Sequence, residues 1–240
     1  KIMDPACGSG GVLVESLRYI WEKAEIEYND LGWPKHEIEI EKQKIAIKNL
    51  RGIDKDYFLS KVAKAYMALL GDGRGGIFCE NSLEATNHWN KKTRDEIKFE
   101  YFDHILTNPP FGSKIQVKGE EMLKQYELGH SWKIDKKTNK FAKGKLKAKE
   151  TPQILFIERC LHLLKPGGKL AIVLPDGILG NDTLTYLREW ILDRAKVLAV
   201  IDVPIETFMP YTSTKTSVLL LKKYDLKDTI GEDYKVFMAK

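Results

Sequence analysis

Short apolar runs alternate along this chain with longer stretches in which apolar residues recur at helical spacing. The short runs predict buried strands at residues 1–3, 50–54, 76–79, 102–107, 169–174, 197–203 and 217–221. The longer stretches predict helices at residues 9–28, 36–48, 62–70, 152–164 and 183–195. Two helices are expected to end at glycine-containing turns, Gly71-Asp72-Gly73 and Lys165-Pro166-Gly167-Gly168.

This alternation of strands and helices predicts an α/β fold with a doubly wound, mostly parallel sheet. Ligands of such sheets bind outside the carboxyl ends of the strands. We therefore expect the functional residues in the turns that follow the predicted strands.

The turn Asn108-Pro109-Pro110-Phe111 follows the strand predicted at residues 102–107. Two consecutive prolines continue neither a β-ladder nor a helix, so they fix the backbone of the turn. The Asn108 amide oxygen and the Pro109 carbonyl oxygen are then able to accept hydrogen bonds from one amino group, with the Phe111 ring nearby. This predicts a clamp for a planar ring that carries an amino group. An ordinary Asn-Pro turn is the alternative.

A glycine-rich turn, Asp4-Pro5-Ala6-Cys7-Gly8-Ser9-Gly10-Gly11, joins the first predicted strand to the first helix. Such a helix start presents free N–H groups and a positive dipole end to an anion. A dinucleotide is disfavoured, because Leu13 stands where the third glycine is required and Asp4 would repel a pyrophosphate. A ligand with one carboxylate and one ammonium group fits better, and S-adenosylmethionine has both. A turn that binds no ligand is the alternative.

DPACGSGG at residues 4–11, followed by NPPFG at residues 108–112, resembles the amino-methyltransferases of DNA. The order of the motifs is similar to that in the modification subunit of type I restriction-modification systems, from residue 1 to about residue 223. The resemblance implies a Rossmann-like class I S-adenosylmethionine-dependent methyltransferase with a seven-stranded sheet whose last strand is antiparallel. It also implies a catalytic domain at residues 1–224 with a truncated first strand. Residues 225–240 would be a C-terminal extension that starts a missing region.

The ends of the next two strands supply further candidates for the cofactor. Asp54 is expected to accept hydrogen bonds from ribose hydroxyls, with Asp56 as the alternative. Asn81, followed by Ser82, is expected to pair with the adenine edge of the cofactor, where the resembled family usually has an Asp. The predicted cofactor-binding residues are Asp4, Pro5, Ala6, Gly8, Ser9, Gly10, Asp54, Asn81 and Ser82.

The resemblance assigns the catalytic role to Asn108, Pro109, Pro110 and Phe111. The two acceptors would hold the 6-amino group of an adenine that is flipped out of the duplex, while Phe111 stacks on its ring. Phe208 is expected to supply the opposite face of this base pocket, because the family has a late aromatic residue there. A phenylalanine of the core is the alternative for Phe208.

Composition is ordinary for a soluble globular domain, with 43% apolar and 30% charged residues among 240. No apolar run approaches the ~20 residues that a membrane span requires. Cys7, Cys79 and Cys160 lack the spacing of a disulfide framework or a zinc site. We therefore expect a cytoplasmic protein with no metal site and no membrane association. Cys7 is interpreted as a small filler beside the glycines.

Residues 114–149 form the longest stretch without clear periodicity, and their eleven lysines far outnumber the acidic residues. Tyr126, Trp132 and Phe141 are interleaved with them. A basic flap over phosphates is the functional hypothesis, in agreement with the net charge of +5. A solvated insertion is the alternative. The candidate DNA-binding residues are Lys114, Lys118, Lys133, Lys136, Lys137, Lys140, Lys143 and Lys145.

The sequence thus predicts adenine-specific methylation of double-stranded DNA, with S-adenosylmethionine as the methyl donor. By resemblance, the partners would be a DNA-specificity subunit and an ATP-dependent restriction subunit. Two alternatives stay open: an amino-methyltransferase that acts on a guanine of RNA or a glutamine of a protein, and a catalytically idle DNA-binding module.

Overall fold

A computed structural model describes residues 1–71, 76–112, 115–210 and 212–240 of the chain. In the described part, a central sheet is formed by eight strands: β1 Ile2–Asp4, β2 Leu50–Asp54, β3 Ile77–Cys79, β4 Phe102–Thr107, β9 Leu164–Pro175, β10 Ala195–Val203, β11 Thr216–Lys223 and β12 Phe237–Ala239. Their order across the sheet is β12-β10-β11-β9-β4-β1-β2-β3. All neighbours are parallel except β11, which is antiparallel to both β9 and β10.

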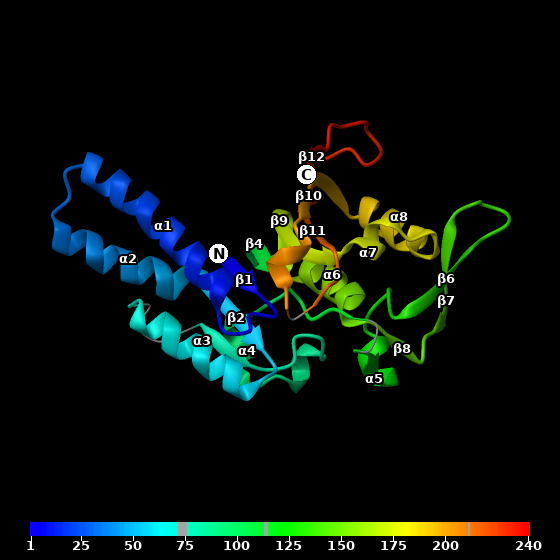
Figure 1. The fold of residues 1–240 in the computed structure, drawn as a ribbon, viewed down its shortest axis with the longest axis horizontal. Coiled ribbons are helices and arrows are strands. Elements are labelled where there is room, and N and C mark those ends of the chain that lie inside the picture. Colours follow the sequence, from blue (N-terminus) through cyan, green and yellow to red (C-terminus); the bar gives the residue numbers. More distant parts are fainter. Residues whose placement is uncertain (72–75, 113–114, 211) are drawn as a thin grey trace.

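Helices lie on both sides of this sheet (Figure 1). The main helices are α1 Gly11–Asp30, α2 Lys35–Asn49, α3 Tyr57–Leu69, α4 Lys91–Glu96, α6 Pro152–Leu163, α7 Asp176–Gly180 and α8 Thr185–Leu192. Helices α1, α2 and α3 lie on one side, and α6, α7 and α8 lie on the other. The ends of α1 and α2 project beyond the body as a helical hairpin. Short 3-10 turns occur at Thr86–His88, Asp182–Leu184 and Ile205–Phe208.

The predicted alternation and the mostly parallel sheet are confirmed. Strand β9 starts earlier than predicted, because residues 165–168 join the strand instead of forming a helix-ending loop. A register shift between Phe102 and His104 of β4 accommodates the extra length. Strand β12 was not predicted. It lies in the expected C-terminal extension and pairs in parallel with β10 at residues 199–201. Of the turn expected to end the third helix, Asp72 and Gly73 lie outside the described residues.

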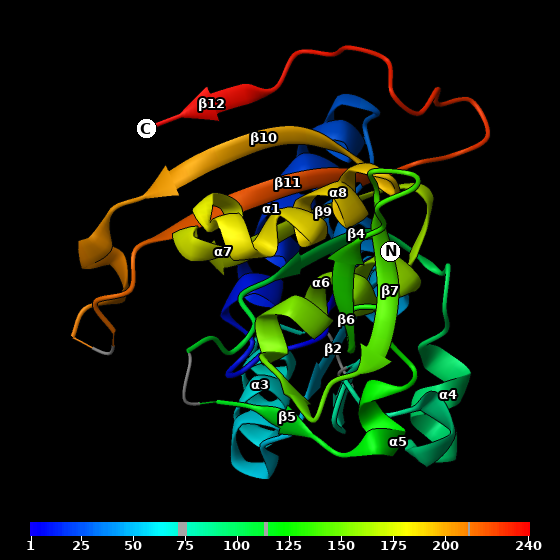
Figure 2. The same ribbon diagram turned by 90° about the vertical axis from the view of Figure 1, so that its right-hand side faces the viewer.

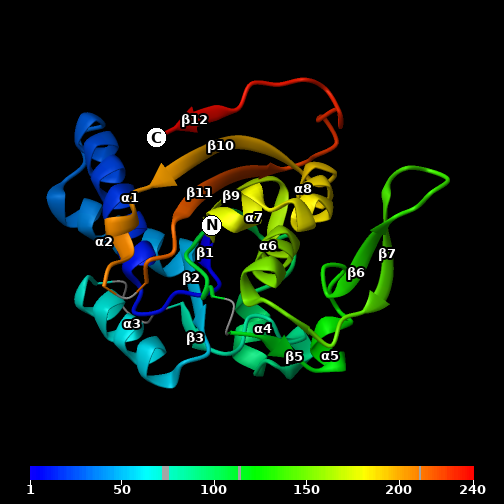
Figure 3. The same ribbon diagram turned by 45° about the vertical axis from the view of Figure 1, so that its right-hand side comes forward.

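The basic insertion contains regular elements, although its sequence shows no clear periodicity. The segment contains β5 Val117–Lys118, α5 Glu120–Leu123, β6 His130–Ile134, β7 Phe141–Leu146 and β8 Lys149–Glu150. Strands β6 and β7 form an antiparallel hairpin, and Trp132 stacks on Tyr186 of α8 with 6.2 Å between ring centroids. Trp132 and Phe141 therefore pack the hairpin against Tyr186 of α8. The exposed lysines on the same strands obscure the apolar alternation in the sequence. Figures 2 and 3 show the hairpin beside α8, and in Figure 3 its tip is directed away from the body.

Burial is deepest where the central strands meet α6 and α8. Met3, Ile105 and Leu170 lie on neighbouring strands, and each is at most 1% exposed. All but one residue of α6 are buried, which explains the strong apolar pattern of that helix. Among the described residues, no helix combines the length and the apolar character that a bilayer span requires.

Candidate active site

A cleft of about 420 Å³ lies at the carboxyl ends of β1, β2, β3 and β4. Its walls bring together residues that are far apart in the sequence. Of the predicted site residues, the cleft is lined by Pro5, Ala6, Gly8, Asp54, Asn81, Ser82, Asn108 and Pro110. The predicted cofactor turns and the predicted catalytic turn therefore share one cavity, as expected for strand ends of a doubly wound sheet.

Two glycines shape the turn between β1 and α1. Gly8 has a φ of +52°, and a Cβ atom at this position would meet no other atom within 4 Å. Gly10 has a φ of +91°, and its Cβ atom would lie 3.2 Å from the Cβ atom of Ala63 on α3. Both backbone conformations favour glycine. Gly8 thus leaves the cleft open, whereas Gly10 permits close packing of the turn on α3.

Asp54 connects the turns after β1 and β2. Its Oδ2 atom accepts a hydrogen bond of 2.8 Å from the Gly8 N–H group, and its Oδ1 atom accepts one of 2.8 Å from the Asp56 N–H group. Asp56 in turn caps α3, because its Oδ1 atom accepts a hydrogen bond from the Leu59 N–H group at 2.9 Å. The carboxylate of Asp54 is therefore oriented by two backbone donors while it lines the cleft.

The turn after β3 is joined to the turn after β1. The Ser82 hydroxyl donates a hydrogen bond of 2.5 Å to the Pro5 carbonyl oxygen. The Asn81 Oδ1 atom accepts from the Leu83 N–H group at 3.1 Å, and its Nδ2 atom donates to Glu84 at 3.3 Å. Both polar groups of the Asn81 side chain thus have hydrogen-bond partners within their own turn. These partners would compete with the adenine that the sequence predicts for Asn81.

Asp4 lies below the cleft and does not line it. Its side chain is 1% exposed, and it accepts a hydrogen bond of 3.0 Å from the Ala6 N–H group. Burial raises the pKa of Asp4 to about 7, opposed by the nearby Thr107 hydroxyl and the Ala6 N–H group. The buried Thr107 hydroxyl has no hydrogen bond of normal geometry. Asp4 ends β1 and Thr107 ends β4, so Asp4 lies between the glycine turn and the end of β4.

Cys7 is also buried, and desolvation raises the pKa of its thiol. Its surroundings agree with the role of a small filler, because a Cβ atom on Gly52 of β2 would lie 3.1 Å from the Cys7 Sγ atom. The remaining residues of the turn, Ser9 and Gly10, do not line the cleft.

The predicted catalytic turn presents one free amide to solvent. Asn108 is exposed, Pro109 is buried and Pro110 is exposed. Within the described residues, the Asn108 side chain has no hydrogen-bond partner, in contrast to Asn81. The Phe111 ring meets the Phe208 ring edge to face, with centroids 6.1 Å apart and an interplanar angle of 83°. The structure thus brings together the two aromatic residues predicted for the base pocket, next to the cleft residue Pro110.

The cleft has further walls that the sequence reasoning missed. They come from the turn after β2, the turn after β3, the insertion and α6, and comprise Lys55, Leu59, Leu83, Ile115, Gln116, Val117, Met122, Pro152 and Phe156. The spacing of Pro152 and Phe156 on an amphipathic helix was the only signal available for any of them. Helix α7, which follows β9 directly, does not line this cleft.

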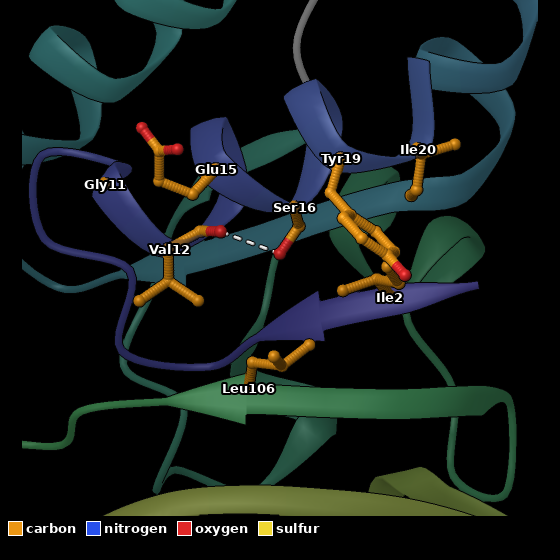
Figure 4. Close-up of a pocket in the computed structure, with 8 residues that line it drawn as sticks. All are labelled: Ile2, Gly11, Val12, Glu15, Ser16, Tyr19, Ile20 and Leu106. Carbon is orange, nitrogen blue, oxygen red and sulfur yellow. Dashed lines mark hydrogen bonds between the residues drawn. The ribbon is translucent and has the colours of Figure 1, made fainter. Parts of the chain in front are cut away.

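A cavity of about 530 Å³ lies between α1, β1 and β4 on the other side of the glycine turn. Figure 4 shows Ile2 and Leu106 of the sheet facing Tyr19 and Val12 of α1 across it. The lining is almost entirely apolar, and the Ser16 hydroxyl donates a hydrogen bond of 2.7 Å to the Val12 carbonyl oxygen. Because few polar groups converge there, this cavity is a poorer candidate for a reaction site than the cleft.

The candidate DNA-binding lysines are distributed over two places. Lys118 lies on β5, and the others that the structure describes lie exposed on the β6–β7 hairpin: Lys133, Lys136, Lys137, Lys140, Lys143 and Lys145. Lys114 lies outside the described residues. In the views of Figures 1 and 3, the hairpin tip lies apart from the carboxyl ends of β1 and β4, so it does not cover the cleft.

Comparison with known proteins matches residues 1–239 to the family model described as N-6 DNA Methylase. The methylase subunit of the type I restriction enzyme EcoEI from Escherichia coli is 26% identical over 224 residues. That alignment covers 93% of this chain but only 38% of the relative. The chain therefore spans well under half the length of this relative.

Solved structures show the fold. A Listeria monocytogenes protein assigned to the class I S-adenosylmethionine-dependent methyltransferases superposes with a TM-score of 0.68 at 20% identity, covering 99% of this chain and 57% of that one. The M protein of the type I restriction enzyme EcoKI from Escherichia coli superposes with a TM-score of 0.63 at 22% identity, covering 95% and 40% respectively. These likenesses confirm the predicted class I methyltransferase fold.

Asp4→Asn is expected to flatten the pH dependence of stability. The folded-state pKa of about 7 exceeds the ordinary value of 3.8, so the stability contributed by the protonated Asp4 carboxyl is fully present below about pH 4 and is lost as the pH rises to about 7. Asparagine keeps an acceptor for the Ala6 N–H group but has no charge to bury. Thermal unfolding between pH 4.5 and 8.5 should show the variant gaining on the wild type as the pH rises, by up to about 1.4 kcal/mol per unit of pKa shift.

Glu22→Gln, on the exposed face of α1, is the matched control and should leave the shape of the wild-type profile unchanged. Parallel pH profiles for Asp4→Asn and the wild type would contradict the assignment of a protonated, buried Asp4.

Proposed function

The chain belongs to the N-6 DNA methylase family, and from this premise we propose that its cleft binds S-adenosylmethionine and methylates the 6-amino group of a flipped adenine in DNA. The observation that carries the proposal is the shared cavity. It joins the turns after β1, β2 and β3 to a free Asn108 amide at the end of β4. A cofactor held by the first three turns would therefore face the fourth.

The residues of the cleft suit this cofactor. Oriented by two backbone N–H groups, the Asp54 carboxylate keeps lone pairs for ribose hydroxyls. Gly8 leaves open space in the cleft, and α1 begins without a side-chain cap on its N-terminal N–H groups. Those donors suit the carboxylate of a methionine moiety. Leu59, Leu83 and Phe156 supply apolar surface for a flat ring.

In this account S-adenosylmethionine supplies an electrophilic methyl group, and the chain's own residues prepare the acceptor. Asn108 and the Pro109 carbonyl accept the two hydrogens of the adenine amino group, which favours a tetrahedral nitrogen whose lone pair is directed at the methyl carbon. Fixed dipoles of this kind stabilise charge that develops during transfer. Because the methylated nitrogen is acidic, its proton leaves to water and no strong general base is needed.

Phe111 and Phe208 are proposed to bind the target base. Their edge-to-face contact closes an aromatic pocket beside the catalytic turn. A flipped adenine would replace this ring–ring contact with stacking on Phe111, which offsets part of the cost of extrusion from the duplex. A catalytically idle DNA-binding module is the less favoured alternative, because such a module does not need an unpartnered, exposed Asn108 amide in its cleft. An RNA guanine or a protein glutamine as acceptor is disfavoured by the family match to DNA methylases.

We propose that the chain is the catalytic domain, residues 1–224, of a modification subunit, with residues 225–240 as an extension. Its inferred partners are double-stranded DNA, a DNA-specificity subunit and an ATP-dependent restriction subunit, all in the cytoplasm. The similarity to type I methylase subunits and to a structure of an assembled type I restriction-modification system supports this. Strand β12 would then anchor the extension to the edge of the sheet at β10.

The exposed lysines of the β6–β7 hairpin are proposed to contact DNA phosphates at a distance from the target base. Since the hairpin does not cover the cleft, its contacts would fall on a flanking part of the duplex. The stacking of Trp132 on Tyr186 holds the hairpin against α8, which supports one direction for the lysines. Lys118, next to the cleft residue Val117, would contact DNA nearer the cleft.

Gly8→Ala is expected to lower the affinity for S-adenosylmethionine at least tenfold, because its methyl group enters the cleft. Gly32→Ala is the matched control. Both glycines have a left-handed φ and no atom within 4 Å of a built Cβ, but Gly32 lies in the α1–α2 turn. Both variants should lose roughly 1 kcal/mol of stability from backbone strain. Calorimetric titration should show weakened binding for Gly8→Ala alone; equal affinities would refute the cleft assignment.

Asn108→Ala is expected to lower the rate of methyl transfer roughly 10²–10³-fold, because one of two preorganised acceptors is lost. Affinity for S-adenosylmethionine should be unchanged. The assay measures single-turnover transfer to DNA with the specificity subunit present. Asn87→Ala removes the same amide from an exposed position outside the cleft and should transfer at the wild-type rate. Wild-type activity in Asn108→Ala would rule out the proposed clamp.

Replacing Lys133, Lys136, Lys137 and Lys140 by Gln is expected to weaken DNA binding and flatten its salt dependence. Each lost phosphate contact lowers the slope of log affinity against log salt by about 0.9. The control set, Lys23, Lys35, Lys44 and Lys48, removes the same charge from exposed positions on α1 and α2. A similar change in slope for both sets would assign the effect to net charge and leave the hairpin without a specific role.

A further inference from the structure

Arg159 on α6 is a buried cation, only 1% exposed, without a carboxylate partner among the described residues. Its Nε atom donates to the Tyr126 hydroxyl at 2.8 Å. Its Nη2 atom donates to the Glu84 carbonyl oxygen at 3.0 Å and to the Gln125 Oε1 atom at 2.8 Å. A longer contact of 3.4 Å reaches the Leu83 carbonyl oxygen. The guanidinium therefore bonds to two different segments of the chain, the turn after β3 and the insertion.

The Leu83 carbonyl oxygen is the point where these segments meet. It also accepts hydrogen bonds from the Tyr126 hydroxyl at 2.8 Å and from the Gln125 Nε2 atom at 2.9 Å. Leu83 itself lines the cleft, as do Met122 of the insertion and Phe156, three residues before Arg159 on α6. One side chain thus joins three walls of the same cavity.

Burial of the Arg159 guanidinium is energetically less favourable than filling the same space with an apolar side chain. A buried charge without an ionic partner is costly, and the Arg159 Nη1 atom has no hydrogen-bond acceptor in the described structure. An apolar side chain would pack between the Tyr126 and Phe99 rings, whose centroids lie 5.0 and 5.3 Å from the Arg159 Cζ atom. Replacement of buried ionic groups by apolar ones is often neutral for stability. The rigid fork of donors is what an apolar residue lacks.

We propose that Arg159 is a positioning residue, which fixes the wall against which the adenine of S-adenosylmethionine binds. The inference rests on the proposed function. If Asp54 holds the ribose and Asn108 faces the transferred methyl group, the apolar side chains of Leu83, Phe156 and Leu59 are left for the adenine ring. Arg159 contacts none of the ligand and acts through the position of Leu83.

The test measures binding of two ligands to the 240-residue chain by calorimetry. S-adenosylmethionine has the whole cofactor, whereas methylthioadenosine has the adenine and ribose without the amino-acid tail. Arg159→Met should lower the affinity for both ligands by the same factor, at least tenfold, because the loss is at the adenine end. Arg159→Lys, which keeps the charge but not the fork, should recover only part of the affinity.

Glu158→Gln is the matched control. Glu158 is the neighbouring residue on α6, is also 1% exposed, and accepts hydrogen bonds from the Glu127 and Leu128 N–H groups rather than at the cleft. It should change thermal stability without changing either affinity. If Arg159→Met does not fold, Tyr126→Phe is the second variant, because it removes one hydrogen-bond donor to the Leu83 carbonyl oxygen with little change in volume. It should lower the affinity for both ligands by the same factor, and by less than is expected for Arg159→Met.

The outcomes separate this inference from the proposed function. A wild-type chain that binds neither ligand would overturn the proposed function. Wild-type binding with affinities unchanged within twofold in folded Arg159→Met, or in Tyr126→Phe where the former does not fold, would overturn only the role of Arg159. A loss confined to S-adenosylmethionine would likewise overturn it, because the methionine end would then be affected instead of the adenine end.

Discussion

The hydrogen bond from the Gly8 N–H group to the Asp54 carboxylate is the interaction on which the candidate site depends. It joins the turns after two neighbouring parallel strands, and it requires a left-handed backbone at Gly8. The Cys7 N–H group adds a second link to the Ile53 carbonyl oxygen at 2.9 Å, and Ser82 adds a third to Pro5. Three turns are thereby locked into one wall of the cleft before any ligand is present, which is the kind of preorganisation that binding requires.

Strand ends were predictable because parallel strands and glycine-rich turns follow strict backbone rules. The turns at Gly8, Asp54, Asn81 and Asn108 all fall where the apolar pattern predicted, and four separate segments meet in one cleft. The apolar pattern does not show which hydrogen-bond partners a polar side chain has or how deeply it is buried. Asp4, for example, is 1% exposed and is buried below the site instead of lining it.

The insertion was the part least accessible from sequence. Its fold depends on long-range contacts, such as Trp132 with Tyr186 and Gln125 with Leu83, which no local periodicity reveals. Lysines dominate its composition, and they masked both the hairpin and the helical turn that contributes Met122 to the cleft. Arg159 of α6 was not recognised either, because a charged residue in a helical pattern is expected to face solvent.

The proposed roles fall on different elements of the fold. In the proposed function, the turns after β1, β2 and β3 would hold the methyl donor and the turn after β4 would hold the acceptor, while residues of the insertion line one side of the cleft. Such a division needs a separate means of bringing DNA to the cleft, because the basic hairpin lies away from it.

The most direct test of the central claim follows the bond that the cleft is proposed to form. DNA whose adenines have ¹⁵N at the exocyclic position is incubated with S-adenosylmethionine that has a ¹³C-labelled methyl group, in the complete complex. Nuclear magnetic resonance of the product should show a one-bond ¹³C–¹⁵N coupling, because the methyl carbon is joined to the adenine amino nitrogen. A ¹³C methyl signal without that coupling would place the methyl group on another atom and contradict the account.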